Sequence, residues 1–270
     1  MFLFFAMWAI KTFADVPKKP RVSIICSVYK GDQFIEGFLQ DITRQTIFYE
    51  CELLLINCNS PGNEELIIEP FLKRYPNIRY VKLNYDPGVY GAWNYAIGMV
   101  RADLITNANL DDRRNPEILK IHAQNLEQDA AVDLVYSDYY ITRYPNETFE
   151  QHRSHCLVKM AEFHPHRMHL CLPGPMPMWR KSFHEKYGYF NGEFFSSGDW
   201  EMWCRAVSKG ARFKRVPVAA GLYYLNPSGL STDAARDERR KREDEYIMKT
   251  YRTFWGFDDS VSLERCNYKA

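Results

Sequence analysis

The stretch Ile105-Thr-Asn-Ala-Asn-Leu-Asp-Asp112 ends an apolar run with two adjacent carboxylates, and the polar residues Arg113-Arg114-Asn115-Pro116 follow it. The run has the length and composition of a strand that delivers acids to its carboxyl tip. In open α/β sheets, ligands collect outside the carboxyl ends of the strands, so Asp111 and Asp112 are candidates for a metal or phosphate site. A solvated turn is the plain alternative.

Alternating strands and helices surround this tip. Continuous apolar and β-branched runs predict buried strands, and apolar residues at helical spacing predict helices between them. The strands are predicted at 21–29, 52–57, 78–83, 103–107 and 132–137, and the helices at 34–43, 64–74, 89–100 and from Pro116 to 128. This order favours an α/β fold with a mostly parallel central sheet and helices on both faces.

The second half of the sequence is less regular. From Tyr139 onward the periodicity is lost in a long segment rich in aromatic and histidine residues, which we interpret as substrate-facing. Phe213–Val218 and Leu222–Leu225 are expected to be edge strands. Asp233–Tyr251 predicts a highly charged helix with few apolar residues, which we interpret as a solvated cap.

Composition narrows the class of protein. The 270 residues carry a formal net charge of +1 with the basic residues spread along the chain, so a nucleic-acid-binding face is disfavoured. The seven cysteines show no Cys-x-x-Cys spacing, and Cys26, Cys58 and Cys171 fall in segments that we expect to be buried. Free thiols of this kind fit a reducing, cytoplasmic compartment.

The N-terminal residues 1–10 are almost wholly apolar. They are too few to span a bilayer, which requires about 20 apolar residues in a helix. The first basic residue, Lys11, follows the apolar stretch, whereas a secretory signal carries basic residues before it. We therefore expect residues 1–14 of a cytoplasmic protein to dock on the domain, on a partner or on a membrane surface.

A second acidic candidate is Asp199. It follows the small residues Ser196-Ser-Gly198 and opens a predicted helix with an apolar face that includes Trp200 and Trp203. The plain interpretation is an N-cap or first-turn acid, which would stabilise the helix by about 1 kcal/mol. The sequence leaves the structural and the chemical role both open.

Five pieces of the chain, in this order, resemble family 2 glycosyltransferases of the GT-A fold. They are Val22–Tyr29, Leu53–Ser60, Gly88–Asn94, Asn109–Asp112 and Gly198–Trp203. The resemblance implies one GT-A (Rossmann-like) α/β domain at 21–232, with a nucleotide-binding half at 21–138 and an acceptor-binding half at 139–232. Residues 1–20 precede it as an apolar segment and linker, and residues 233–270 follow it as a charged C-terminal helix and tail.

The resemblance also implies a nucleotide-sugar donor, with a UDP-sugar as the expected one. Asn57 and Cys58 stand where the family usually carries two aspartates, and Trp93 stands in place of an arginine. An amide can still form a hydrogen bond with a uracil or thymine edge. The positions that match the family's donor contacts are Ser27, Tyr29, Asn57, Asn59, Gly88, Asn94, Asn109 and Asp111.

The tip Asn109-Leu-Asp-Asp112 resembles the family's Asp-x-Asp-Asp motif. That likeness implies a divalent cofactor, Mn²⁺ or Mg²⁺, with Asp111, Asp112 and Asn226 as ligands. Asn226 stands where some members carry a late histidine. Hard cations of this kind bridge carboxylates to a diphosphate and carry its charge as it leaves. Because Asn109 supplies no charge, Asp111 is the principal expected ligand.

The helix start Gly198-Asp199 resembles the family's Glu-Asp pair, with the glutamate missing. This implies that Asp199 is the catalytic base of an inverting transfer to a carbohydrate acceptor. Gly198, Trp179 and Trp200 are the expected acceptor contacts, because aromatic faces can stack on sugar rings. Ordinary core packing is the alternative for both tryptophans.

The sequence leaves room for three other functions: a binding domain without activity, a zinc site and an oxidoreductase. The amides Asn57, Asn109 and Asn226 are compatible with a degenerate GT-A domain that binds nucleotide or glycan without transfer. A zinc site among the histidines at 164–169 is disfavoured, because no carboxylate or thiolate with tetrahedral spacing accompanies them. An oxidoreductase is disfavoured, because the first strand-turn-helix unit lacks Gly-x-Gly-x-x-Gly.

Overall fold

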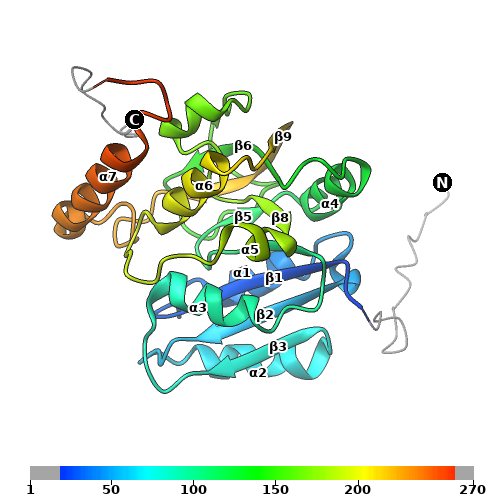
Figure 1. The fold of residues 1–270 in the computed structure, drawn as a ribbon. Coiled ribbons are helices and arrows are strands. Elements are labelled where there is room, and N and C mark those ends of the chain that lie inside the picture. Colours follow the sequence, from blue (N-terminus) through cyan, green and yellow to red (C-terminus); the bar gives the residue numbers. More distant parts are fainter. Residues whose placement is uncertain (1–18, 259–270) are drawn as a thin grey trace.

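The computed structural model describes residues 19–258, and a nine-stranded sheet forms its centre (Figure 1). The strand order is β3-β2-β1-β4-β8-β6-β9-β5, and β7 pairs with β6. The strands are β1 (Val22–Val28), β2 (Cys51–Asn57), β3 (Ile78–Lys82), β4 (Leu104–Asn107), β5 (Arg113–Arg114), β6 (Leu134–Thr142), β7 (Cys156–Val158), β8 (Met178–Arg180) and β9 (Phe213–Tyr224).

Helices cover both faces of the sheet, as the alternation of elements predicted. The side chains of α1, α2 and α4 pack in one apolar cluster, and those of α3, α5, α6 and α7 pack in another. The helices are α1 (Ile35–Ile42), α2 (Glu64–Arg74), α3 (Gly88–Ile97), α4 (Ile118–Gln128), α5 (Ser182–Tyr187), α6 (Gly198–Ser208) and α7 (Asp237–Tyr251).

Strand β2 shows why the sheet is buried on both sides. Every residue of β2 is buried, and successive side chains of a strand point to opposite faces. Leu53 and Leu55 accordingly join the cluster of α1, whereas Leu54 and Ile56 join the cluster of α3. A continuous apolar run is therefore the expected pattern for a central strand with helices on both faces.

Most long strands run in one direction. Strand β1 is parallel to β2 and β4, β2 is parallel to β3, and β6 is parallel to β9. Strand β8 is antiparallel to both β4 and β6, so β6 and β9 run in the same direction as β4. The carboxyl ends of β1, β2, β3, β4, β6 and β9 therefore meet at one edge, which we call the carboxyl edge. The predicted mostly parallel sheet is confirmed.

The second half of the chain is more regular than predicted. Strand β6 continues to Thr142, so the irregular region begins after that residue and not at Tyr139. The two predicted edge strands are one strand, β9, which lies between β6 and β5. Its register shifts between Val216 and Ala219, at a bulge that contains Pro217. A proline is tolerated at a bulge because no ladder hydrogen bond is required there.

The polar residues after the tip form a buried strand and not a solvated turn, which was the plain alternative. Arg113 and Arg114 form β5, which pairs with Leu222 and Gly221 of β9. A Cβ atom on Gly221 would lie 2.1 Å from the carbonyl oxygen of Arg113, so only glycine allows the two backbones to approach this closely. The tip is consequently fixed to the end of β9.

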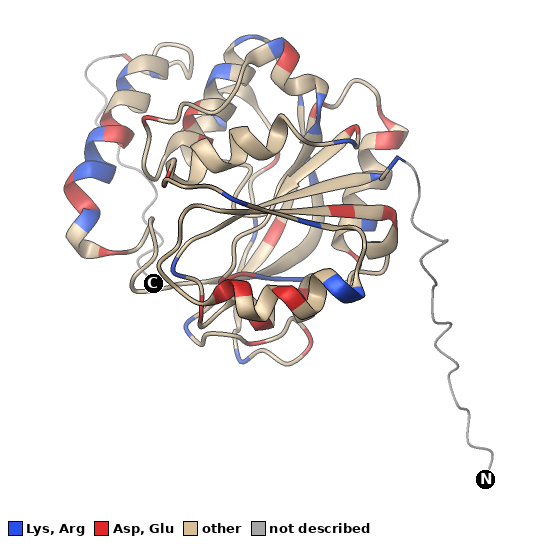
Figure 2. Cartoon of the chain, turned by 90° about the horizontal axis from the view of Figure 1, so that it is seen from below, with Lys and Arg blue, Asp and Glu red and all other residues tan. Residues whose placement is uncertain are grey.

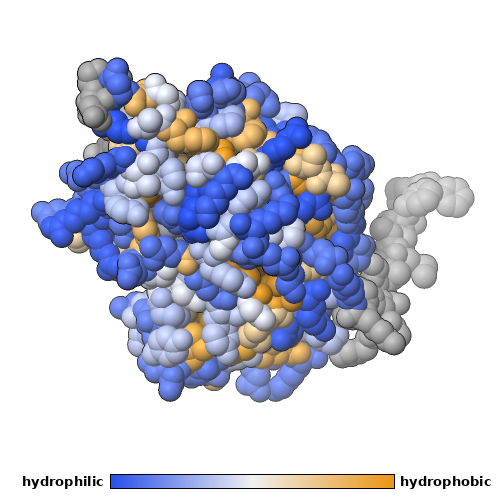
Figure 3. Space-filling view, in the orientation of Figure 1, coloured by the Kyte–Doolittle hydropathy of each residue, from blue (hydrophilic) through white to orange (hydrophobic). Residues whose placement is uncertain are grey.

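Helix α7 carries charges of both signs along its length (Figure 2). Most of the helix is solvated, as expected, and Ile247 and Tyr251 anchor it to the domain. Two details differ from the expectation: Tyr246 is exposed, and the charged Asp244 is buried. Most of the face shown in Figure 3 is hydrophilic, with small apolar groups between. Among residues 19–258, none of the helices is both long and apolar enough to cross a bilayer. The expected contact through residues 1–14 lies outside the described residues.

Candidate active site

The carboxyl edge brings together most of the predicted donor residues. Ser27 lies at the end of β1 and Tyr29 follows it, and Asn57 ends β2 with Asn59 in the following loop. Asp111 follows β4 and Asn226 follows β9. Segments that lie far apart in the sequence thus meet here because their strands share one direction.

Asp111 and Asn226 are in direct contact. The Nδ2 of Asn226 donates a hydrogen bond of 3.0 Å to Oδ2 of Asp111, which is half-buried. The side-chain Oδ1 of Asn226 accepts from the backbone N–H of Ser228 at 3.1 Å. In this structure Asn226 therefore orients Asp111, and its oxygen is not presented as a ligand in the way the sequence suggested.

Asp112 points inward rather than beside Asp111. Its Oδ1 accepts from the backbone N–H of Tyr224 at 3.1 Å, and its Oδ2 accepts from Nδ2 of Asn109 at 3.0 Å. Burial, together with the nearby charge of Asp111, raises the pKa of Asp112 well above the ordinary carboxyl value. Asp112 and Asn109 thus fix the tip to β9, so the expectation that Asp112 faces a metal is not met in this conformation.

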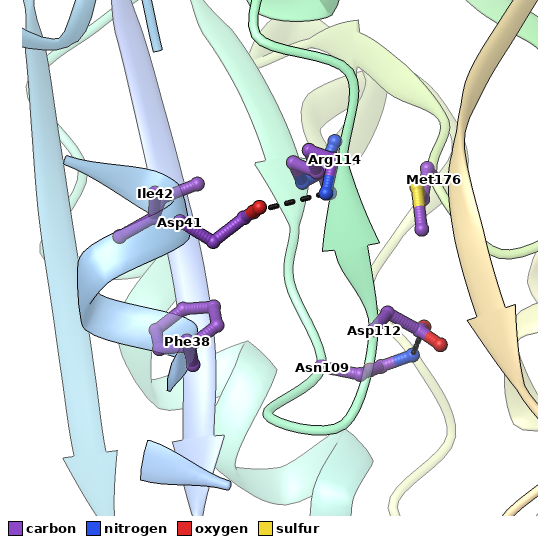
Figure 4. A pocket seen from close by; sticks show the side chains of 7 residues that line it. All are labelled: Phe38, Asp41, Ile42, Asn109, Asp112, Arg114 and Met176. Atoms are coloured by element: carbon purple, nitrogen blue, oxygen red, sulfur yellow. Dashed lines mark hydrogen bonds between the residues drawn. The ribbon is translucent and has the colours of Figure 1, made fainter. Parts of the chain in front are cut away.

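Two buried arginines support the tip. The Nη1 of Arg113 donates to the carbonyl oxygens of Leu110 and Asp112, and the Nη2 of Arg114 donates to the carbonyl oxygen of Asn107. Asp41 of α1 accepts from the backbone N–H of Arg114 at 2.9 Å (Figure 4). The small pocket drawn there leaves no room for a water molecule, so it is a packing feature and not a sugar site.

The predicted nucleotide contacts differ in how open they are. Tyr29 and Asn59 are exposed, and Asn59 has a positive φ of 54°. Asn57 is buried, and both ends of its amide are hydrogen-bonded within the protein. Its Nδ2 donates to the hydroxyl of Tyr80, and its Oδ1 accepts from the backbone N–H of Ser60. In this conformation Asn57 fixes the loop after β2.

Helix α3 contacts the segment around Phe190, which precedes α6. Its first residue, Gly88, is exposed with a positive φ of 71°. The amide of Asn94 donates to the carbonyl oxygen of Phe190 at 2.7 Å and accepts from its N–H at 3.1 Å. Trp93 is buried and contacts Phe190 edge-on. Asn94 and Trp93 thus fix the chain before α6, and the contact of Asn94 with the nucleotide stays a prediction.

Asp199 lies in the first turn of α6 and is half-buried. Its Oδ1 accepts from the hydroxyl of Tyr90 at 3.0 Å and from the backbone N–H of Trp200 at 2.9 Å. Tyr90 belongs to the first turn of α3, which begins beyond the carboxyl end of β3. The start of α6 is therefore at the same edge of the sheet as Asp111.

Helix α7 fixes the loop that precedes Asp199. The carboxylate of Glu243 accepts from the backbone N–H groups of Phe195, Ser196 and Ser197 at 2.5, 2.9 and 2.9 Å. The neighbouring Asp244 accepts from the hydroxyl of Ser197 at 2.6 Å. Two acids of α7 thereby fix the loop before α6. The two helices lie near each other in Figure 1.

The structure corrects the acceptor role of the two tryptophans. Trp179 and Trp200 are both 0% exposed. The indole N–H of Trp179 donates to His184, and that of Trp200 donates to the carbonyl oxygen of Met168 while its ring stacks on Trp255. Their faces are covered by protein, so both belong to the core. Gly198, also buried, packs against the ring of Tyr90.

A preformed metal cage is absent from residues 19–258, since no three His, Cys, Asp or Glu side chains there converge. At 164–169 the ring of His164 lies edge-on to that of His166, and its Nδ1 accepts a hydrogen bond from the backbone N–H of His166 at 3.3 Å. A Mg²⁺ or Mn²⁺ that binds with a diphosphate needs only one or two protein carboxylates. Asp111 meets that requirement, because it is half-buried and forms no ion pair within the described part of the chain.

Sequence reasoning missed the residues that fix the two acids. Tyr90, Glu243 and Arg113 each act on a segment far away or on the backbone, and nothing in their own neighbourhood in the sequence marks them. The one available signal was Gly198, a glycine at the start of a helix. A Cβ there would lie 2.7 Å from Cε2 of Tyr90, so the tyrosine ring fills the space in which the resemblance implied a glutamate.

A family model matches most of the chain. A model described as glycosyl transferase family 2 matches residues 23–188, which extend from β1 to just past α5. The tip lies inside the matched range, and Asp199 lies beyond it. The uncharacterized glycosyltransferase YwdF of Bacillus subtilis (strain 168) is 24% identical over 225 residues, which are 82% of this chain and 81% of YwdF.

Solved structures share the arrangement of the sheet and helices. The mannosyltransferase PcManGT from Pyrobaculum calidifontis, in complex with GDP-Man and Mn²⁺, gives a TM-score of 0.66 at 16% identity over 87% of this chain and 65% of its own. Truncated S. aureus TarS in complex with UDP-GlcNAc gives 0.65 at 17% identity over 79% and 61%. The chain spans about half of the longer TarS structure, 46%. At such identities the likeness concerns the fold.

Proposed function

This chain belongs to glycosyl transferase family 2 and is a glycosyltransferase with the GT-A fold, and we propose that it transfers a sugar from a nucleotide donor to a carbohydrate hydroxyl with inversion. The observation that carries the proposal is the pair of half-buried acids at the carboxyl edge. Asp111 and Asp199 each accept a hydrogen bond from a neutral side chain, Asn226 and Tyr90 respectively. Each acid is thus oriented by a hydrogen bond from a group that carries no charge.

Asp111 marks the donor side of the site. Its carboxylate would hold Mn²⁺ or Mg²⁺, whose positive charge would stabilise the leaving diphosphate. Asn226 orients the carboxylate, and Asp112 and Asn109 keep the tip against β9. The exposed Tyr29 and Asn59 are available to the nucleoside without a change of fold.

Asp199 marks the acceptor side as the general base. The acceptor oxygen forms the new bond to the anomeric carbon as the bond from that carbon to the diphosphate oxygen breaks. The electron pair of the broken bond leaves with the nucleoside diphosphate, and the hydroxyl proton passes to Asp199. One base suffices for this displacement, because no covalent glycosyl-enzyme forms.

A UDP-sugar is the proposed donor, with GDP-sugars as the first comparison. TarS has been solved with UDP-GlcNAc and PcManGT with GDP-Man, so structures of this fold are known with either base. The acceptor contacts must come from residues other than Trp179 and Trp200, since both are enclosed in the core.

The test is turnover by the full chain with Mn²⁺ over a panel of UDP-, dTDP- and GDP-sugars. We expect one donor to be consumed, by transfer or by slow hydrolysis, and the released sugar or product to have the inverted anomeric configuration by NMR. Binding of a donor without any turnover would favour the degenerate, binding-only interpretation. A retained configuration would contradict the single-base mechanism.

A further inference from the structure

We propose that Tyr90 is a positioning residue for Asp199, and that Gly198 is required because it makes room for the tyrosine ring. The inference rests on the proposed function, in which Asp199 is the base. It concerns a contact between two helices whose first turns lie 109 residues apart in the sequence. Neither residue was expected to act on the base.

The hydroxyl of Tyr90 has a fixed place. The ring is buried, stacks on Phe190 with 5.9 Å between centroids, and meets Trp93 edge-on at 5.4 Å. Asn94 fixes Phe190 in turn through two backbone hydrogen bonds. A ring enclosed in this way cannot turn its hydroxyl to solvent, so the hydroxyl stays beside Asp199.

The position of the Tyr90 ring requires a glycine at position 198. A Cβ atom at position 198 would lie 2.7 and 2.8 Å from two ring carbons of Tyr90, and 2.9 Å from Cβ of Phe194. Contacts under about 3.0 Å require the ring to shift, and the ring is confined by its aromatic neighbours. Any side chain at 198 therefore moves the hydroxyl away from Asp199.

The hydroxyl can serve both protonation states of the base. Its single proton faces two acceptors, Oδ1 of Asp199 at 3.0 Å and the carbonyl oxygen of Ser196 at 2.7 Å. While Asp199 is ionised, this proton stabilises the carboxylate. Once Asp199 has taken the acceptor proton, the hydroxyl can donate to Ser196 alone and accept from the carboxyl group. The base thus never loses its partner.

Tyr90 stays protonated throughout. Burial and the charge of Asp199 raise the pKa of Tyr90 well above its usual value, and the more distant Glu243 acts in the same direction. The phenol therefore acts as a neutral hydrogen-bond donor and does not compete with Asp199 for the acceptor proton.

The first experiment compares Tyr90→Phe with Tyr95→Phe, using whichever donor the panel identifies. Tyr95 lies on the same helix but is 42% exposed, so its variant should match the wild type. For Tyr90→Phe we expect kcat to fall about tenfold with little change in KM for the donor, since the lost bond is to a charged group. Removing a donor from a carboxylate raises its pKa, so the acid limb of the kcat profile should move to higher pH.

A second experiment guards against a variant that is merely misfolded. Gly198→Ala should reduce kcat in the wild-type background and much less in a Tyr90→Leu background, where the ring is gone, with thermal unfolding measured for each variant. Additive effects of the two substitutions would overturn the proposed steric link. Wild-type kcat and pH profile for Tyr90→Phe would overturn the positioning role. If Asp199→Asn were itself fully active, the base assignment would fail instead.

Discussion

The two ends of the parallel strands carry acids in opposite surroundings. Near the amino end, Glu52 is 0% exposed and accepts from the guanidinium groups of Arg79 and Arg101 at 3.2 and 2.8 Å. At the carboxyl edge, Asp111 and Asp199 are half-buried and accept from an amide and a phenol. At the first end two guanidinium groups pair with the buried acid, and at the second end Asp111 and Asp199 accept hydrogen bonds from side chains that carry no charge.

This difference separates a structural acid from a chemical one. A carboxylate paired with two arginines has little remaining attraction for a cation or a proton, whereas a carboxylate held by neutral donors keeps its charge. Burial alone does not distinguish the two cases. Glu52 and Asp111 differ in the charge of their hydrogen-bond donors, and the effect of that difference can be tested by removing one charge at a time.

The largest effect is expected for Asp199→Asn. The variant keeps the shape of the side chain and loses the base, so transfer should fall by about 100-fold to 10,000-fold. Donor binding, measured by calorimetry, should change little, because Asp199 serves the acceptor. Loss of donor binding together with transfer would mean that the two sides of the site are not separate.

A smaller effect, on stability rather than on kcat, is expected for Glu52→Gln. The two arginines would lose a charged partner while staying partly exposed, so the free energy of unfolding in urea should fall by about 1–3 kcal/mol at pH 7. Glu50→Gln is the matched control at the same end, where the carboxylate pairs with Arg21 at 3.3 Å but is 43% exposed, and it should cost under about 0.5 kcal/mol.

The pH dependence of Glu52 follows from the same contacts. Burial opposes its ionisation, but hydrogen bonds from Ser23 and Arg101 outweigh that effect and hold the pKa of Glu52 below its usual value. An acid with a lowered pKa stabilises the fold above its unfolded value of about 4.3 and loses that contribution as the pH falls below it. The difference in the free energy of unfolding between the wild type and Glu52→Gln should therefore become smaller at acidic pH. A gap independent of pH would contradict the ionic role.

The smallest effect is expected for Glu243→Gln. Its carboxylate accepts three backbone hydrogen bonds before α6 and its side chain is 11% exposed, so the variant should lower kcat about fivefold through the position of Asp199. Glu238→Gln on the same helix, at 90% exposure, should have no effect. Equal kcat for both variants would show that α7 does not act on the site.

Sequence patterns predicted what depends on neighbours along the chain. The apolar runs of β1 and β2 and the tip after β4 were found because a strand buried on both faces leaves an unbroken apolar signature. The sequence predicts two strands in place of β9 because the small residues Ala219-Ala-Gly221 interrupt that signature, although the close approach of β5 to Gly221 accounts for the glycine. Local composition cannot show that such a break is bridged by a partner strand.

The contacts between distant segments at the site could not be predicted from the sequence, because local patterns do not show which segments meet. The contact of Tyr90 with Asp199 spans 109 residues, and those of Glu243 span 46 to 48. Trp179 and Trp200 were expected at the acceptor because an aromatic residue near a site suits either a sugar or the core. Only the three-dimensional packing distinguishes these roles, and it encloses both side chains.

The most direct test of the comparison is a calorimetric titration of UDP, GDP and dTDP into the wild type and Asp111→Asn, each with and without Mn²⁺. If the carboxyl edge keeps its charge for a metal-bound diphosphate, Mn²⁺ should strengthen binding of at least one nucleotide to the wild type by about 100-fold and have almost no effect on the variant. The same Mn²⁺ enhancement in both proteins, or none in the wild type, would contradict the account.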